Sequence, residues 1–227
     1  MDNLQWSQKT INKFSPLFKP RWEVYTDTLL KYLDKSKVWI DLGCGFNNTV
    51  LTHQNLVKQA IGVDVVDCKE SNFIKADIRH IPLPSDYADI VTLRFVAEHF
   101  ENKHEYINEI KRVLKKRGIL IILTTNLLSP FIFIPKILLP YSLKNKILTK
   151  LFKVNDEDVF PTYHKLNTPA SFESLKPDFN IIKMIFISDL NATRKWVFYI
   201  LFIWHKFTQK AKLEKLQTNL LVILEKQ

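Results

Sequence analysis

Hydrophobic and polar positions form two kinds of pattern along this chain. Short runs that are apolar on both faces have the length of buried strands, and they occur at residues 37–42, 60–65, 73–76, 88–93 and 119–124. Apolar positions three and four residues apart predict helices over residues 49–57 and 103–116. Gly118 follows the second of these helices, where a left-handed cap would end it.

The alternation of strands and helices predicts a doubly wound α/β sheet, because parallel strands need crossover connections. Two later apolar runs, at residues 179–187 and 219–225, bring the expected strands to seven. We therefore predict a mostly parallel, Rossmann-like sheet. The carboxyl ends of its strands should meet along one edge, where ligands bind in such folds.

The same patterns predict four segments within a single domain. Residues 1–36 form an N-terminal helical segment, and residues 37–126 form the core with the first five strands. Residues 127–178 are a helical and loop insertion after the fifth strand. Residues 179–227 supply the last two strands, with an aromatic and basic helix between them over 192–215.

Composition excludes several classes of protein. A hydrophobic content of 46% is ordinary for a globular chain. Cys44 and Cys68 are the only cysteines and do not form a CxxC pair, so we expect neither a disulfide framework nor a metal site, and a cytoplasmic setting fits best. No run of about 18 apolar residues predicts a membrane-spanning helix.

The formal net charge is +10, which favours an anionic partner such as a membrane surface or nucleic acid. The lysines are scattered along the sequence rather than clustered. A surface that simply keeps the protein in solution explains the charge equally well.

The residues that are candidates for binding a ligand lie where the predicted strands end. The first strand runs into DLGCGFN, in which Gly43 and Gly45 permit a tight turn and a close approach of the backbone to a ligand. Asp64 ends the second strand, about 20 residues on, where an acidic side chain can accept ribose hydroxyls. Asp77 follows the third strand. Each aspartate alone could cap a turn, but three of them, counting Asp41, beside a glycine turn favour a nucleoside site.

These runs resemble the motifs of class I S-adenosylmethionine-dependent methyltransferases. VWIDLGCGFNNTVL is similar to the first motif and AIGVDVVD to the second, and KADIRHIPLPSDYADIVTLRFVAEHF and FENKHEYINEIKRVLKKRGILIILTTN resemble the later ones. The resemblance covers residues 37–126 and is greatest to the branch related to ubiquinone and menaquinone methyltransferases. Two departures stand out: Asn47 replaces a frequent third glycine, although asparagine tolerates left-handed geometry, and KKRG replaces KPGG.

The resemblance implies that S-adenosyl-L-methionine is the methyl donor. By position, the methionine part would lie against Asp41, Gly43 and Gly45, and the ribose against Asp64 and the adjacent Val65. The adenine would meet Asp77 and Ile78, and the sulfonium would lie between Arg94 and Phe95. A dinucleotide is the rival ligand, but the turn lacks the GxGxxG spacing that seats a pyrophosphate on a helix end.

A later run, DVFPTYHKLNTPASFESL, resembles an FPTYYRxNT segment of a bacterial methyltransferase group. Its place after the fifth strand makes Tyr163, His164 and Asn167 candidates for contact with the acceptor. His164 and His99 are candidate general bases, because histidine titrates near neutral pH. For His99 we favour a role near the site without proton transfer. For His164, the roles of base and of structural loop residue stay open.

The acceptor is expected to be a small molecule, lipophilic or linked to a lipid or saccharide. The apolar runs 127–139 and 196–204 carry aromatic residues and flanking cations, as interfacial helices do, which predicts peripheral contact with an anionic membrane. A helix buried inside the protein is the alternative. Two other functions stay open: a non-catalytic or regulatory protein that binds S-adenosylmethionine, and an RNA methyltransferase. We rank the latter last, because no NPPY-like tetrapeptide or paired-cysteine motif is present.

Overall fold

The computed structural model describes residues 5–138, 161–191 and 194–227. Its centre is a seven-stranded sheet with the strand order β3-β2-β1-β4-β5-β7-β6, which confirms the predicted α/β class. The strands are β1 (Val38–Leu42), β2 (Gln59–Asp64), β3 (Phe73–Lys75), β4 (Ala88–Arg94), β5 (Leu114–Thr125), β6 (Phe179–Ile187) and β7 (Asn219–Lys226).

The first five strands are parallel neighbours. Strand β1 pairs with β2 on one side and with β4 on the other, so the direction of winding reverses between β1 and β4. Such a switch point opens a crevice at the carboxyl ends of the strands, which is where doubly wound folds bind ligands. The topology therefore places the end of β1, at Leu42, beside the end of β4.

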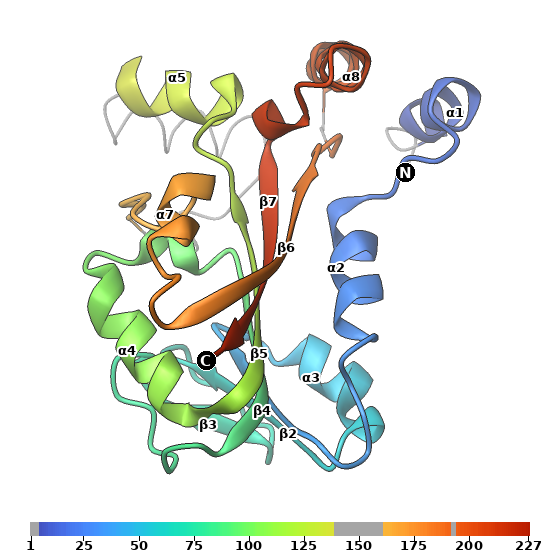
Figure 1. Cartoon of the computed structure of the whole chain (residues 1–227). Helices are drawn as coiled ribbons and strands as arrows, with labels where there is room; N and C mark the ends of the chain where they lie inside the picture. Colours follow the sequence, from blue (N-terminus) through green and yellow to red (C-terminus); the bar gives the residue numbers. More distant parts are fainter. Residues whose placement is uncertain (1–4, 139–160, 192–193) are drawn as a thin grey trace. The chain divides into compact units, whose positions relative to one another are not determined.

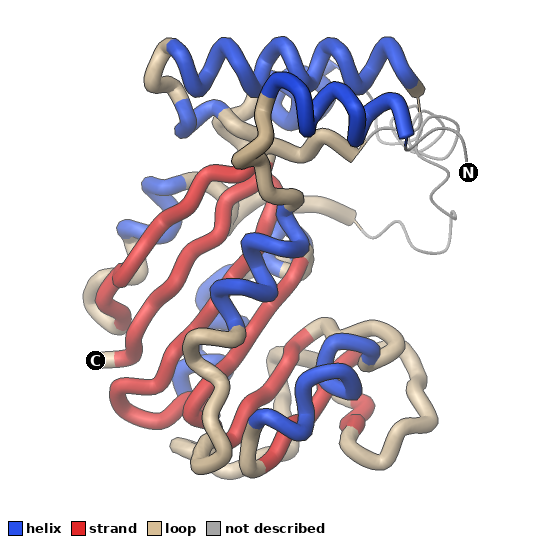
Figure 2. The backbone as a smooth tube through the Cα atoms, turned by 90° about the vertical axis from the view of Figure 1, so that its right-hand side faces the viewer, coloured by secondary structure: helices blue, strands red, loops and turns tan. Residues whose placement is uncertain are grey.

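Helices cover both faces of the sheet. Helix α4 (Lys103–Val113) and helix α7 (Pro169–Glu173) lie on one face, and α2 (Arg21–Leu29) and α3 (Asn48–His53) lie on the other (Figures 1 and 2). The remaining elements are α1 (Gln5–Phe14), α5 (Pro130–Leu138), α8 (Lys195–Lys210) and the short 3-10 turns η1 (Gln54–Leu56), η2 (Ala97–His99) and η4 (Glu214–Leu216). Within the described residues, no helix combines the length and apolar character needed to cross a bilayer.

One predicted boundary is wrong. The helix expected over 103–116 ends at Val113, and β5 begins at Leu114, which pairs with Ala88 of β4. The ladder then shifts register, and Arg117 rather than Gly118 takes a left-handed backbone, with φ of 61°. Strand pairing overrides the local helical pattern here, so Gly118 is not a helix cap.

Two other expectations differ in extent. The expected aromatic and basic helix over 192–215 spans Lys195–Lys210. Of the helical and loop insertion expected over 127–178, the structure describes α5 and α7, and residues 139–160 lie outside the described residues.

Contacts divide the chain into two compact units. The larger comprises residues 25–125, 162–185 and 220–227 and holds most of the sheet, and the smaller comprises 1–24, 126–161 and 186–219. In the smaller unit Phe198 and Phe202 of α8 pack with Leu190, against partly buried side chains that include Trp6 of α1. The rings of Trp6 and Phe198 meet edge to face at 4.8 Å.

His205 gives this smaller unit a pH dependence. Its Nδ1 lies 2.9 Å from Ser188 Oγ, and burial lowers its pKa from 6.5 to about 4. Because the pKa is lower in the folded state, stability is full above pH 6.5 and falls as the pH drops toward 4. Between pH 7 and pH 5 we expect a loss of roughly 1–2 kcal/mol in the free energy of unfolding.

Denaturant unfolding at the two pH values measures this loss. His205→Gln retains a hydrogen-bonding group for Ser188 but does not titrate in this range, so its stability should depend less on pH by the same amount. Equal pH dependence of the variant and the original protein would show that His205 is not responsible.

Candidate functional site

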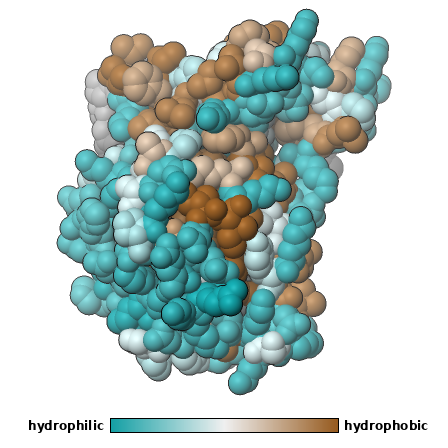
Figure 3. Space-filling view, viewed as in Figure 1, coloured by the Kyte–Doolittle hydropathy of each residue, from teal (hydrophilic) through white to brown (hydrophobic). Residues whose placement is uncertain are grey.

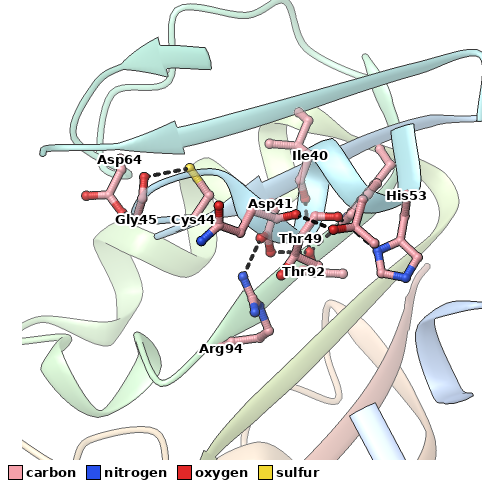
Figure 4. A network of polar contacts seen from close by, with 12 residues as sticks. Ile40, Asp41, Cys44, Gly45, Thr49, His53, Asp64, Thr92 and Arg94 are labelled. Carbon is pink, nitrogen blue, oxygen red and sulfur yellow. Dashed lines mark hydrogen bonds and ion pairs between the residues drawn. The ribbon is translucent and has the colours of Figure 1, made fainter. Parts of the chain in front are cut away.

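A buried ion pair marks the switch point between β1 and β4. The Asp41 carboxylate is 1% exposed; one oxygen accepts from Thr92 Oγ1 at 2.6 Å and the other from Arg94 Nη2 at 2.9 Å (Figure 4). The indole of Trp39 donates to the same Thr92 oxygen at 2.9 Å. A carboxylate and a guanidinium thus stand together at the ligand-binding edge of the sheet.

Burial sets the electrostatics of this pair. It raises the pKa of the Asp41 carboxyl, while Arg94 and the Thr92 hydroxyl pull that pKa down. The Arg94 guanidinium lies 5.5 Å from the centre of the buried Tyr25 ring, which α2 contributes. Desolvation by burial also raises the pKa of the Tyr25 phenol. Tyr25 thus forms an apolar, uncharged wall beside Arg94.

The turn after β1 has the conformation that its glycines permit. Gly43 and Gly45 have φ of 69° and 57°, and Asn47 follows with φ of 61°, so asparagine does accept the left-handed geometry expected of it. A Cβ on Gly43 would lie 2.2 Å from Val96 Cγ2, whereas a Cβ on Gly45 would meet nothing within 4 Å. Position 43 therefore requires glycine because of its left-handed backbone and because a Cβ has no room there. Position 45 favours glycine because of its left-handed backbone alone.

Asp64 closes the turn from the neighbouring strand. Its Oδ2 accepts from the Gly45 backbone N–H at 2.7 Å and its Oδ1 from the Val66 N–H at 3.0 Å. A carboxylate has about four acceptor positions, so Asp64 can still accept two hydroxyls. Beside it, Phe46 is 75% exposed and Val65 is 54% exposed. These apolar side chains suit the faces of a nucleoside.

Asp77 and Ile78, the expected adenine contacts, follow β3. Asp77 is held by Arg79, whose Nη2 lies 2.6 Å from its Oδ2, and these hydrogen bonds lower the pKa of the carboxyl. Ile78 is buried. A cavity of about 340 Å³ lies next to this segment, lined by Arg79, His80, Glu105, Asn108, Glu109 and Arg112. Its lining is charged and internally paired, as in Arg112–Glu109, and it does not include the glycine turn.

Arg94 and Phe95, expected near the sulfonium, end β4. The Phe95 N–H donates to the Leu123 carbonyl at 2.7 Å, and Phe95 itself has φ of 56°. A left-handed phenylalanine is uncommon and marks a strained bend in the chain. The bend carries the chain from β4 into η2, so that Val96 lies over Gly43.

Glu98 anchors the candidate acceptor loop to this edge. Its backbone carbonyl accepts from the N–H groups of Tyr163 at 2.8 Å and His164 at 3.0 Å. Its buried carboxylate accepts from Thr124 Oγ1 at 2.8 Å, and burial raises the pKa of that carboxyl. The structure therefore brings Tyr163 and His164 to η2, which also contains His99.

His164 is oriented by its own loop. The side-chain amide nitrogen of the buried Asn167 lies 2.6 Å from His164 Nδ1. This contact holds the imidazole ring in one orientation within the loop.

Three residues of the site escaped sequence reasoning, namely Thr92, Tyr25 and Glu98. Thr92 is a polar position inside an apolar strand, and that interruption is a signal that could have identified it. Tyr25 and Glu98 lie in ordinary helical and turn patterns. Their roles depend on contacts with residues 26 or more positions away, which no local pattern records.

The thiol of Cys44 is protonated at this edge of the sheet. Burial, together with Asp41 and Asp64, raises the pKa of the Cys44 thiol to about 12, so the thiolate is scarce at neutral pH. In the part of the chain that the structure describes, no three His, Cys, Asp or Glu side chains are grouped to hold a metal ion.

Comparison with known proteins agrees with this geometry. Residues 40–122 match a family model described as a methyltransferase domain. The uncharacterized methyltransferase YcgJ of Bacillus subtilis is 31% identical over 93 residues, which span 35% of this chain and 37% of that protein. The chain therefore matches little more than a third of this relative in sequence.

Solved structures extend the similarity to nearly the whole fold. The YcgJ structure covers 90% of this chain and 98% of its own, with a TM-score of 0.56 and 15% identity. A SAM-dependent methyltransferase from Archaeoglobus fulgidus covers 97% and 100%, with a TM-score of 0.58 and 16% identity. Residues 40–122 thus resemble a methyltransferase domain, and the chain has the fold of class I S-adenosylmethionine-dependent methyltransferases.

The same fold also occurs in a protein of different chemistry. The [4+2]-cyclase SpnF matches with a TM-score of 0.55 and 17% identity, covering 92% of this chain and 84% of its own. Fold alone therefore does not fix the reaction.

Proposed function

We propose that this protein transfers a methyl group from S-adenosylmethionine to a small acceptor that is lipophilic or linked to a lipid or saccharide. The observation that carries the proposal is the arrangement of Asp41, Gly43, Gly45 and Asp64 at the switch point of the sheet. These residues lie within the segment that matches the methyltransferase domain.

The residues at this edge fit the donor's parts. Asp64 has acceptor capacity for the ribose hydroxyls, and its bond to Gly45 couples ribose binding to the shape of the turn. Arg94 Nε is buried without a hydrogen-bond partner among the described residues, so the guanidinium can still bind a carboxylate such as that of methionine. Phe46 and Val65 supply apolar contact for the adenosine.

S-adenosylmethionine, held by Asp41, Gly43, Gly45 and Asp64, would supply a methyl group on a sulfonium for in-line attack by a nucleophile of the acceptor. The acceptor would gain the methyl group, S-adenosylhomocysteine would be the leaving group, and the acceptor's proton would pass to solvent. Alignment contributes most of the rate in such a displacement. We assign alignment of the acceptor to Tyr163 and His164, which Glu98 holds beside η2. His99 supports η2 without transferring a proton.

Asp64→Ala tests the donor site. Losing the acceptor of both ribose hydroxyls should weaken binding of S-adenosylhomocysteine by roughly 1–3 kcal/mol, or about five- to 150-fold. Isothermal titration calorimetry measures the affinity. Asp67→Ala is the matched control, because Asp67 is exposed and forms a surface ion pair with Lys75. Equal affinities of the two variants would mean that Asp64 does not hold the ribose.

The acceptor class needs a separate measurement. Protein incubated with methyl-labelled S-adenosylmethionine and a cell extract should transfer label mainly into the fraction that partitions into chloroform. Label confined to the aqueous fraction would contradict the lipophilic acceptor while leaving methyl transfer intact.

Binding without turnover is the second candidate function. This alternative is supported by the [4+2]-cyclase SpnF, which has the same fold and a name that describes a different reaction. Tight calorimetric binding of the donor, with no label transferred to any fraction of the extract or to the protein itself, would support this alternative over catalysis.

A further inference from the structure

Helix α8 has two apolar faces: one packs within its own unit, and the other is exposed among the residues that the structure describes. Phe198, Phe202 and His205 face inward, with the first two in the cluster around Leu190. On the opposite side, five large apolar residues are exposed, at Trp196, Tyr199, Ile200, Ile203 and Phe207. These positions are three, four, seven and eleven residues from Trp196, so they form one stripe on a helix of about 3.6 residues per turn.

The uncovered stripe is bordered by positive charge. Lys195, Lys206 and Lys210 fall on one flank of the stripe by their helical positions, and Lys212 follows the helix. No acidic residue occurs between Asp189 and Glu214. A long exposed apolar stripe with lysines and no acidic residues beside it is complementary to a surface whose outer layer is anionic and whose deeper layer is apolar.

Helix α5 enlarges this surface on the other flank. Phe131 of α5 meets Trp204 of α8 edge to face at 5.7 Å, which fixes the two helices side by side. Phe133, Ile134, Ile137 and Leu138 of α5 are exposed as well. Figure 3 shows hydrophobic residues gathered over α5 at the upper left of the view.

We propose that the exposed stripe of α8, with the adjoining residues of α5, lies on the headgroup region of an anionic lipid bilayer. Tryptophan and tyrosine favour this region because each joins an apolar ring to a polar tip. With 16 residues, α8 is about 24 Å long, which suits a helix lying in the plane of the interface. The inference goes beyond methyl transfer and does not depend on it.

Vesicle flotation tests this directly. The protein should float with phosphatidylcholine vesicles that contain phosphatidylglycerol, with a partition coefficient at least about tenfold higher than with phosphatidylcholine alone. Trp196→Ser with Ile203→Ser should lower the partition coefficient about tenfold or more, since these side chains are 59% and 67% exposed and contribute to binding rather than to the core. Leu56→Ser with Ile182→Ser, at sites 42% and 48% exposed in the larger unit, should leave partition unchanged.

Two double variants with the same net charge separate the effect of the lysines on α8 from the effect of the protein's net charge. Lys195→Glu with Lys210→Glu should abolish the preference for vesicles that contain phosphatidylglycerol. Lys58→Glu with Lys116→Glu lowers the net charge by the same amount but should retain most of that preference. Every variant should bind S-adenosylhomocysteine as the original protein does, so a failed methyl-transfer assay has no bearing on the result.

Three outcomes would overturn the proposal. The first is a protein that stays at the bottom of the gradient with both vesicle types. The second is flotation that the α8 substitutions do not reduce. The third is a chain that elutes as an oligomer and becomes monomeric with Trp196→Ser and Ile203→Ser, which would assign the stripe to contact between copies.

Discussion

Gly43→Ala should lose most of its affinity for S-adenosylhomocysteine, at least tenfold, and should be less stable than the original protein by roughly 2–5 kcal/mol. Two costs add. Alanine at φ of 69° is strained by about 1–2 kcal/mol, and its Cβ would lie 2.2 Å from Val96 Cγ2. Because Val96 leads into η2, relief of the overlap must move either the turn or the segment that carries Glu98, and overpacking of this kind costs about 1–3 kcal/mol.

Gly45→Ala is the matched control, because the two glycines share a left-handed backbone and differ in their surroundings. A Cβ at Gly45 meets nothing within 4 Å, so only the backbone strain of about 1–2 kcal/mol remains. Calorimetry with S-adenosylhomocysteine and denaturant unfolding measure both effects. Equal losses in the two variants would show that contact with Val96 does not restrict the turn.

Asp41→Ala should lower the free energy of unfolding by about 3 kcal/mol. The substitution leaves the Arg94 guanidinium, 18% exposed, beside the buried Tyr25 ring without its carboxylate, and it also removes the acceptor of the Thr92 hydroxyl. Breaking a buried pair by removing one partner costs about 3–5 kcal/mol, and the slight exposure of Arg94 places this case at the lower end.

A double-mutant cycle provides the control for Asp41. Asp41→Asn with Arg94→Gln removes both charges and retains polar groups of similar size, so it should be closer in stability to the original protein than Asp41→Ala is. Denaturant unfolding of the single and double variants gives the coupling energy. A double variant as unstable as the sum of the two single variants would show that the pair does not interact.

Much of the candidate donor site could be predicted from the sequence, because its motif is local. The tight turn at Gly43 and Gly45 and the acidic ends of the first two strands follow from residue types a few positions apart. Their arrangement then follows from the rule that parallel strands end at one edge. Asn47 in left-handed geometry was likewise predictable, because asparagine is one of the few residues that adopt it readily.

The partners of those residues were not predictable in the same way. Arg94 was expected near the sulfonium, but its ion pair with Asp41 joins residues 53 positions apart. Glu98 holds the loop at Tyr163 and His164 through a backbone carbonyl, which carries no residue-specific signal in the sequence. The helix ending at Val113 depends on pairing between Leu114 and Ala88, which prevails over a helical pattern that continues past it.

The sequence by itself determined the order of strands and helices and the glycine turn of the candidate donor site, since hydrophobic period and glycine chemistry act over a few neighbouring residues. The tertiary structure alone decided which charges pair in the buried site, where helix α4 ends and which face of α8 is left uncovered. Those features depend on burial and on contacts between segments far apart in the sequence, and such contacts form only when the chain folds.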